Sequence, residues 1–184
     1  MIAPEAARKI RLLGLDVDGV LTDNALWLAP IDGDRVEFKR WDFQDGLGLV
    51  VLRHTPVEVA WISGRHSEST ELRARDLKVA TLIMDNSARK LPAVEALLQQ
   101  KGLGWNEFAY VGDDLADLPV LRRAGIPIAV ANACAEVKAA AAHVTALPGG
   151  HGAVREVVES LLKARGEWDS AVEAYLRERG ETPA

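Results

Sequence analysis

Residues 12–22 read LLGLDVDGVLT, and this stretch decides the fold. Its apolar run, Leu12–Leu15, has the length and composition of a buried strand. Two carboxylates one residue apart, Asp16 and Asp18, follow the strand, and Gly19 then permits a tight turn of the backbone. In open parallel sheets, ligands bind just outside the carboxyl ends of the strands. The stretch therefore predicts an acidic pair at a ligand-binding edge.

A second apolar segment further along the chain also ends in carboxylates. Residues 108–111 have the composition of another buried strand, and Asp113, Asp114 and Asp117 follow Gly112. Because the carboxyl ends of parallel strands share one edge of a sheet, the two acidic groups are expected to meet there. Clustered carboxylates repel one another and need a cation, and oxygen-only ligands suit Mg²⁺. An acidic pair alone is more often a turn cap, but two such clusters favour a shared magnesium site.

Composition restricts the class of protein. The chain has 184 residues, 48% hydrophobic and 27% charged, and a formal net charge of −5, which fits one domain over residues 1–184. The lack of a basic run argues against nucleic acid as a partner, and a single cysteine, Cys134, excludes a disulfide framework and a cysteine-rich zinc site. No apolar run is long enough for a membrane span, and the first ten residues lack a signal-peptide core. We therefore expect a cytoplasmic protein without a membrane partner.

Strand and helix patterns alternate along the chain. Strands are predicted at residues 10–15, 57–62, 79–84, 107–111 and 126–131, with an edge strand at 143–145. Helices are predicted at residues 46–54 (with Asp45 as N-cap), 67–76, 87–101, 116–124, 135–142, 152–163 and 168–179. A β-hairpin insertion is expected at about 24–41, around Asp32-Gly33, and a C-terminal helix and tail at about 167–184. The pattern predicts a single Rossmann-like, three-layer α/β domain with a mostly parallel central sheet and helices on both faces.

The acids and their neighbours suggest phosphoryl-transfer chemistry. A carboxylate such as Asp16, beside a metal, can attack phosphorus and form an aspartyl-phosphate, while Asp18 protonates the leaving oxygen and later activates water. Ser63-Gly64-Arg65 ends the second strand with a hydroxyl and a backbone N–H at a helix start, which together suit an anion. Lys90 opens the helix after the third strand and could add a positive charge. Taken singly, Ser63 fits a turn or helix-cap residue equally well, and a lysine such as Lys90 is usually a solvated surface residue. Lys90 gains weight because its strand should end beside the others.

In that order and spacing, these motifs resemble the haloacid dehalogenase superfamily, and most closely its capless 3-deoxy-D-manno-octulosonate 8-phosphate phosphatase branch. The resemblance covers residues 10 to about 165. It is carried by DVDGVLTD at 16–23, the Asp32-Gly33 hairpin, DGLG at 45–48, SGR at 63–65, Lys90, GDDLADLP at 112–119 and GGHGAVRE at 149–156.

The resemblance implies a role for each matching residue and an assembly. It implies a magnesium-dependent phosphatase for a phosphorylated sugar acid in lipopolysaccharide synthesis, forming a homotetramer in which neighbours cover the active sites. The apolar hairpin residues Leu26, Trp27 and Leu28 fit such a contact. The implied catalytic residues are Asp16, Asp18, Ser63 and Lys90. The implied metal ligands are the side chains of Asp16 and Asp113 and the backbone carbonyl of Asp18. The supporting residues are Asp114 and Asp117, and the substrate-binding residues are Gly64, Arg65 and Arg73.

Two departures from the branch leave its substrate open. The branch often has an arginine where this chain has Gln44, and a lysine where this chain has His151, so two fixed positive charges are missing. They are either neutral changes in solvated loops or signs of a related substrate, such as 2-keto-3-deoxynononate 9-phosphate. A phospho-acceptor signalling domain and a catalytically weak assembly domain are alternatives from other classes. The chain retains the full set of Asp16, Asp18, Lys90 and Asp113, which argues against lost catalysis.

Overall fold

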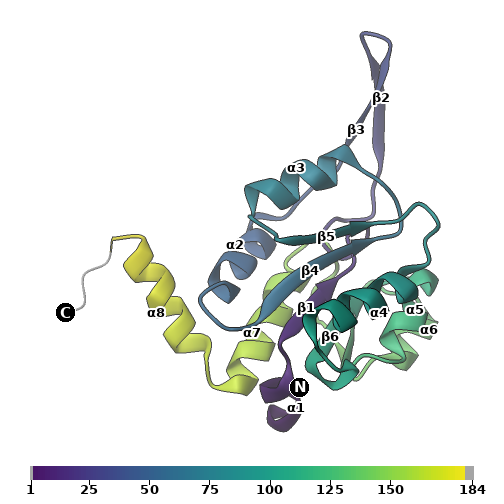
Figure 1. Cartoon of the computed structure of the whole chain (residues 1–184). Helices are drawn as coiled ribbons and strands as arrows, with labels where there is room; N and C mark the ends of the chain where they lie inside the picture. Colours follow the sequence, from purple (N-terminus) through teal and green to yellow (C-terminus); the bar gives the residue numbers. More distant parts are fainter. Residues whose placement is uncertain (1, 181–184) are drawn as a thin grey trace.

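The computed structural model describes residues 2–180, and a six-stranded sheet forms its centre (Figure 1). The strand order is β5-β4-β1-β6-β7-β8, and every neighbouring pair is parallel. The strands are β1 (Leu12–Leu15), β4 (Glu58–Ser63), β5 (Thr81–Met84), β6 (Phe108–Gly112), β7 (Ile126–Ala129) and β8 (His143–Val144). The predicted parallel α/β sheet is therefore confirmed, including its short edge strand.

Helices cover both faces of the sheet. On one face α2 and α7 pack together and contact α1 and α8, and on the other α4, α5 and α6 form a second group (Figure 1). The α-helices are α1 (Pro4–Lys9), α2 (Phe43–Leu52), α3 (Glu68–Asp76), α4 (Lys90–Lys101), α5 (Leu118–Leu121), α6 (Ala135–Ala140), α7 (Ala153–Arg165) and α8 (Trp168–Glu178), with 3₁₀ turns η1 (Trp105–Glu107) and η2 (Leu115–Asp117). None of the helices within residues 2–180 is long and apolar enough to span a membrane.

The central position of β1 places the acidic stretch. Every residue of β1 and of β6 is buried, as expected for strands covered on both faces. Leu15 pairs with Trp61 of β4 on one side and with Val111 of β6 on the other. The chain leaves β1 toward β4 and later returns to its other side as β6, so the end of β1 is a topological switch point. Asp16 therefore emerges where a ligand site is expected.

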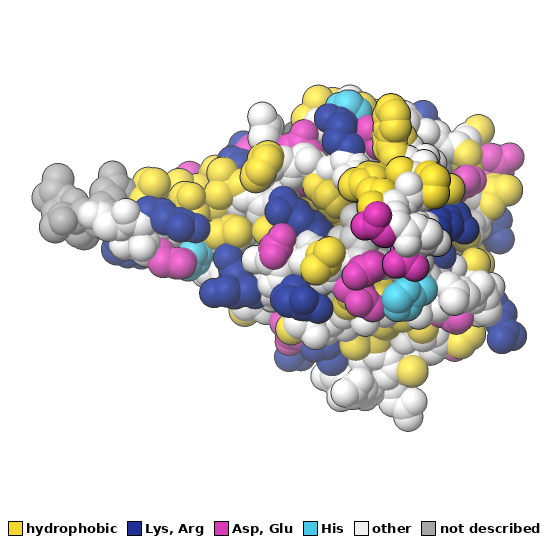
Figure 2. Space-filling view, turned by 90° about the horizontal axis from the view of Figure 1, so that it is seen from above, with side chains coloured by type: hydrophobic (Ala, Val, Ile, Leu, Met, Phe, Trp, Pro, Cys, Tyr) yellow, Lys and Arg dark blue, Asp and Glu magenta, His cyan; other side chains and the backbone are white. Residues whose placement is uncertain are grey.

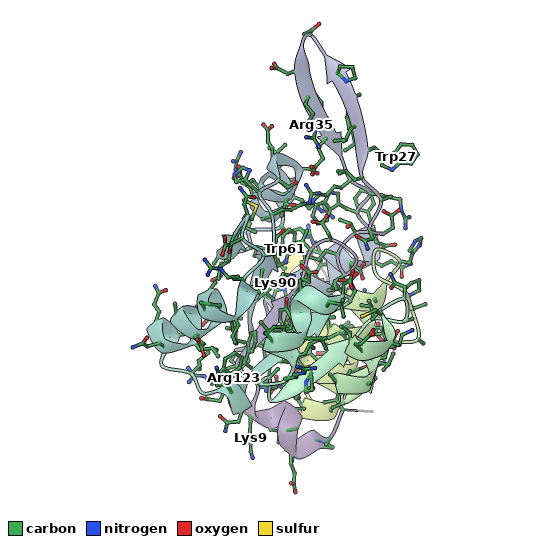
Figure 3. The ribbon with its side chains drawn as sticks, turned by 90° about the vertical axis from the view of Figure 1, so that its right-hand side faces the viewer. Lys9, Trp27, Arg35, Trp61, Lys90 and Arg123 are labelled. Carbon is green, nitrogen blue, oxygen red and sulfur yellow. The ribbon has the colours of Figure 1, made fainter. Side chains whose placement is uncertain are left out.

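The predicted hairpin is confirmed. Strands β2 (Trp27–Ile31) and β3 (Asp34–Phe38) pair antiparallel and project away from the sheet (Figures 1 and 3). Asp32 and Gly33 both have positive φ, 52° and 89°, which is the geometry that a two-residue hairpin turn requires. Trp27 is 66% exposed, so the hairpin presents apolar surface to its surroundings.

The predicted role of Asp45 as an N-cap of its own helix is wrong. Helix α2 begins earlier, at Phe43, and its N-cap is Asp42, whose side chain accepts a hydrogen bond from the Gln44 backbone N–H. Asp45 lies within α2 and is buried, and its carboxylate instead accepts backbone hydrogen bonds from Gly152 and Arg155 at the start of α7. Asp45 thus joins two helices that are adjacent on one face of the sheet.

Two other helices are shorter than predicted. The segment predicted as one helix at 116–124 is divided into η2 and the single turn α5, which has a proline at its start. The helix predicted from residue 87 begins at Lys90, because Ala88 has a left-handed φ of 55° and the preceding residues form a turn.

Candidate active site

Asp16 lies at the carboxyl end of β1 and is buried. Its backbone N–H donates to the Val111 carbonyl, which extends the β1–β6 pairing by one residue. Its carboxylate accepts a hydrogen bond from the Val17 backbone N–H at 2.6 Å and lies 2.6 Å from the Lys90 ammonium. The residue is 6% exposed, so this carboxylate is held in one position rather than solvated.

Asp16 belongs to a cluster of three buried carboxylates. Asp16, Asp113 and Asp117 each present one oxygen within a group no wider than 4.8 Å. Asp113 follows β6 directly, and Gly19 makes room for it, since a Cβ at position 19 would lie 1.9 Å from the Asp113 carboxylate. The predicted meeting of the acids that follow β1 and β6 is what the structure shows.

Asp117 is the hydrogen-bond acceptor at the centre of the cluster. One of its carboxylate oxygens accepts from Lys90 Nζ and from the Tyr110 hydroxyl, both at 2.7 Å. The other accepts from the backbone N–H of Asp113 at 2.9 Å and of Asp114 at 3.3 Å. Its role therefore lies in fixing Lys90 and the loop after β6. Tyr110 was missed by the sequence reasoning, although a tyrosine within an otherwise apolar strand could have signalled a buried polar contact.

Lys90 is the cation of this cluster. It is 4% exposed and lies between Asp16 and Asp117 (Figure 3). Burial disfavours the ammonium form, but the two adjacent carboxylates outweigh burial and raise the pKa of Lys90 above its ordinary value. Lys90 thus stays charged, and three carboxylates share one lysine.

The pKa values of Asp16 and Asp113 are both raised in this crowded acidic cluster. Burial, with the neighbouring Asp117 charge, raises the pKa of Asp16 well above its ordinary value, against the opposing effect of Lys90. Burial and Asp117 likewise raise the pKa of Asp113 to about 7. Both groups would ionise more readily beside an added positive charge.

The cluster fits a hard divalent cation. Its ligand atoms are all carboxylate oxygens, they converge, and their repulsion is only partly relieved by Lys90. Mg²⁺ is bound in proteins by such oxygen ligands, often by one or two carboxylates together with water and substrate phosphate. Among residues 2–180, no other group of three or more His, Cys, Asp or Glu side chains converges in this way.

Asp18 lies outside the cluster, in a second network of charges. Arg65 donates to both oxygens of its carboxylate, at 3.0 and 3.3 Å, and Lys39 Nζ lies 2.8 Å away. Arg65 also donates to both oxygens of Glu37, at 2.6 and 3.2 Å. Burial opposes ionisation of Glu37, but hydrogen bonds from Arg65 and Ser67 lower the pKa of Glu37 to about 2. Glu37 and Lys39 were not among the predicted site residues.

The predicted anion loop lies beside Lys90. Ser63 ends β4 and is buried, and its hydroxyl donates to the Arg65 carbonyl at 2.9 Å. A Cβ at Gly64 would lie 3.3 Å from Ala88 and 3.7 Å from the Lys90 side chain. The structure therefore brings Ser63, Gly64 and Lys90 to the same edge as Asp16.

Two predicted residues lie apart from the acidic cluster. The Arg73 guanidinium lies 5.7 Å above the Phe43 ring, and its Nε is buried without a hydrogen-bond partner among the described residues. Arg73 and Arg65 both line an open groove of about 1280 Å³ between β3 and α3. Asp114 is exposed, and its side chain accepts from the Leu115 backbone N–H, which makes it a cap of η2.

The guanidinium of Arg40 lies beside His151. Arg40 donates to the Gly150 carbonyl at 2.7 Å, contacts the His151 ring and forms an ion pair with Asp23 at 2.8 Å. The positive charge of Arg40 therefore lies against the loop at Gly150 and His151, although His151 itself carries no fixed charge. Gln44 lies near the same loop, since a Cβ at Gly152 would be 3.7 Å from Oε1 of the Gln44 side chain.

Comparisons with known proteins define the class. A family model of haloacid dehalogenase-like hydrolases matches residues 68–156. The chain is 41% identical over 165 residues to the 3-deoxy-D-manno-octulosonate 8-phosphate phosphatase KdsC of Escherichia coli K12, which covers 90% of this chain and 86% of that protein. With this identity over nearly the whole chain, the protein belongs to the haloacid dehalogenase-like hydrolases, as the resemblance implied.

Solved structures narrow the likeness to one branch. The 3-deoxy-D-manno-octulosonate 8-phosphate phosphatase of Moraxella catarrhalis, in complex with magnesium, phosphate and the sugar acid KDO, superposes with a TM-score of 0.86 at 36% identity, over 94% of this chain and 97% of that one. The cobalt-bound deoxy-D-mannose-octulosonate 8-phosphate phosphatase of Haemophilus influenzae gives a TM-score of 0.82 at 36% identity, over 89% and 93%. Both are phosphatases of one sugar acid phosphate, and one holds the metal ion predicted for this chain.

Proposed function

We propose that the chain is a magnesium-dependent phosphatase that hydrolyses 3-deoxy-D-manno-octulosonate 8-phosphate through an aspartyl-phosphate on Asp16. The observation that carries the mechanism is the separation of two acids in adjacent networks. Asp16 is buried against Lys90, whereas Asp18, two residues further, is held by Arg65 and Lys39. One carboxylate is thereby fixed as a nucleophile, and the other is free of the acidic cluster to exchange protons.

The proposed reaction has two steps. In the first, a carboxylate oxygen of Asp16 bonds to phosphorus, the ester P–O bond breaks, and protonated Asp18 gives its proton to the leaving sugar oxygen. In the second, Asp18 takes a proton from water, which attacks phosphorus and releases inorganic phosphate and free Asp16. Lys90, 2.6 Å from Asp16, and the Ser63–Gly64 loop beside Lys90 offer donors that can balance the negative charge of the transferring group.

Asp16 and Asp113 side chains, with the Asp18 backbone carbonyl, are the groups we propose as Mg²⁺ ligands. The raised pKa values of Asp16 and Asp113 support this assignment, because an added cation would relieve their repulsion. When bound, Mg²⁺ supplies positive charge to the phosphoryl oxygens. We assign Asp117 a supporting role, because its oxygens already bind Lys90 and two backbone N–H groups.

The choice of sugar acid rests on the relatives and on the cations near the site. The Escherichia coli and Moraxella catarrhalis proteins described above are octulosonate 8-phosphate phosphatases by name. Arg65 can form the paired hydrogen bonds that suit a carboxylate, although it is bound here by Asp18 and Glu37. A nonulosonate 9-phosphate is the second candidate, favoured by Gln44 and His151; the Arg40 guanidinium beside His151 weakens that case.

We further propose that the chain works as one domain within a homotetramer. One buried apolar cluster runs from Ile2 to Ala171, which supports a single domain. Leu26, Trp27 and Leu28 are 46%, 66% and 48% exposed on the hairpin, and apolar side chains gather on the face seen in Figure 2. A neighbouring subunit would cover this surface. A cytoplasmic location stays a prediction.

The substrate proposal is tested by phosphate release with Mg²⁺ across a panel. The panel contains the octulosonate 8-phosphate, the 2-keto-3-deoxynononate 9-phosphate and hexose 6-phosphates. We expect kcat/KM for the octulosonate to exceed the others at least about tenfold, which is about 1.4 kcal/mol. A preference for the nononate, or a flat profile, would reject the octulosonate while leaving the phosphatase mechanism in place.

A further inference from the structure

The base of the hairpin reaches the proposed acid/base. Lys39 directly follows β3, and its side chain is 0% exposed. Its ammonium forms ion pairs with the carboxylates of Asp18, at 2.8 Å, and Glu37, at 3.6 Å. It also donates a hydrogen bond to the Thr70 hydroxyl at 3.0 Å. The Lys39 side chain is thus held by three protein groups, and the residue borders the groove between β3 and α3.

Glu37 completes the network from the same strand. It lies two residues before Lys39, so both side chains point to the same face of the hairpin. It accepts from Arg65 at 2.6 Å and from the Ser67 hydroxyl at 2.6 Å. Two carboxylates, Asp18 and Glu37, are thereby balanced by two cations, Lys39 and Arg65, and each group fixes the others.

The geometry points to Lys39 as a positioning residue for the acid/base Asp18, with Glu37 holding Arg65 in the same role. This inference rests on the proposed phosphatase mechanism and adds two residues that act through their contacts with Asp18 and Arg65. Lys39 and Arg65 hold both oxygens of the Asp18 carboxylate. Without Lys39, that carboxylate keeps one of its two cationic partners, and its orientation toward the leaving oxygen is no longer fixed.

If Lys39 positions the acid, the loss of kcat/KM on its removal should depend on the leaving group of the substrate. When the ester bond breaks, the proton of Asp18 moves to the leaving oxygen. A sugar alkoxide needs that proton, whereas p-nitrophenolate is stable without it. The first irreversible step determines kcat/KM, so loss of acid positioning should lower kcat/KM for alkyl and phenyl esters far more than for p-nitrophenyl phosphate.

The test compares the wild type with Lys39→Met in the magnesium-loaded enzyme. Substrates are p-nitrophenyl phosphate, phenyl phosphate and the octulosonate 8-phosphate. General acid–base catalysis contributes about 10²–10⁴-fold, so partial loss of positioning should lower kcat/KM for the sugar phosphate and phenyl phosphate by about tenfold or more. The loss should lie mainly in kcat rather than KM, and p-nitrophenyl phosphate should change less than about threefold. Lys39→Arg should restore much of the loss, and Glu37→Gln should show the same pattern to a smaller degree.

Arg35 provides the matched control. It lies on the same strand two residues before Glu37, is exposed, and forms no ion pair within residues 2–180 (Figure 3). Arg35→Met should leave all three substrates unchanged.

Three outcomes would overturn the inference. A loss in kcat/KM for p-nitrophenyl phosphate as large as that for the other two substrates would indicate general damage to the phosphoryl site. A loss confined to the octulosonate would indicate a contact with the sugar. No loss in Lys39→Met would exclude any role for Lys39. The comparison of phenyl with p-nitrophenyl phosphate does not depend on which sugar acid is the natural substrate. Failure of the substrate proposal is therefore distinguishable from failure of this inference.

Discussion

Replacing Asp113 with Asn should stabilise the metal-free protein while removing its response to magnesium. Asp113 is 6% exposed and shares its surroundings with Asp16 and Asp117. Asparagine keeps the size of the side chain and removes a negative charge that the metal-free site cannot neutralise. In the proposed magnesium complex, the same negative charge attracts the cation, so aspartate is the better residue there.

The magnitude follows from the pKa. Burial and Asp117 raise the pKa of Asp113 from 3.8 to about 7 in the folded protein. The folded state thus binds more protons than the unfolded state between these values, and stability falls as pH rises. At 1.36 kcal/mol per unit, ionised Asp113 costs about 4 kcal/mol above pH 7, and the cost vanishes below pH 4. Since the clustered acids can redistribute one proton among themselves, we expect a gain of about 2 kcal/mol in Asp113→Asn at pH 8.

The assay is urea unfolding in EDTA at pH 8 and at pH 5, repeated at pH 8 with Mg²⁺. The free energy of unfolding of the variant should exceed that of the wild type at pH 8 in EDTA. This difference should shrink at pH 5. Mg²⁺ should stabilise the wild type and hardly affect the variant. Asp114→Asn is the control, because that neighbouring carboxylate is exposed and its loss should change little.

The reasoning would be refuted if Asp113→Asn were less stable than the wild type in EDTA at pH 8, or if its gain were equal at both pH values. The first result would mean that the Asp113 carboxylate is needed for folding. The second would mean that its charge is not the source of the cost.

Two further substitutions test the placement of the site. Gly19→Ala should abolish Mg²⁺ stabilisation in thermal unfolding and activity in phosphate release, because its Cβ would lie 1.9 Å from the Asp113 carboxylate. Gly33→Ala is the control and should retain both, because Gly33 has a similar φ (89° against 92°) and a Cβ there would have no atom within 4 Å. Asp45→Ala should lower the free energy of unfolding in urea by about 2–4 kcal/mol, because two backbone N–H groups at the start of α7 lose their acceptor; a loss below about 0.5 kcal/mol would contradict this role.

The sheet and the acidic cluster could be predicted because local patterns and one topological rule suffice for them. Buried apolar runs mark β1 and β6, and parallel strands bring their carboxyl ends to one edge, so Asp16 and Asp113 had to meet. The helix start at Lys90 follows a strand that ends at the same edge. The predicted family, phosphatase class and magnesium requirement agree with the comparisons.

Contacts between distant segments could not be predicted in the same way. Asp45 has the local pattern of an N-cap, and only the packing of α2 on α7 reveals that it caps the other helix. The ion pairs of Glu37 and Lys39 have no local sequence signal, because they depend on how the hairpin base meets the loop after β4. The contact of the Arg73 guanidinium with the Phe43 ring likewise joins two distant segments, and the role of Arg73 in substrate binding stays a prediction.

The most direct test of the central claim is detection of the phosphorylated Asp16. Asp18→Asn enzyme with Mg²⁺ is mixed with p-nitrophenyl phosphate and quenched in acid within milliseconds to seconds, and its peptides are analysed by mass spectrometry. This variant lacks the group that activates water, and its substrate needs no proton donor, so the intermediate should accumulate. The account predicts one phosphoryl group on the peptide that contains Asp16, and none in Asp16→Asn, which should also release no phosphate. Phosphate release by Asp16→Asn at the wild-type rate, or turnover without any phosphorylated peptide, would contradict it.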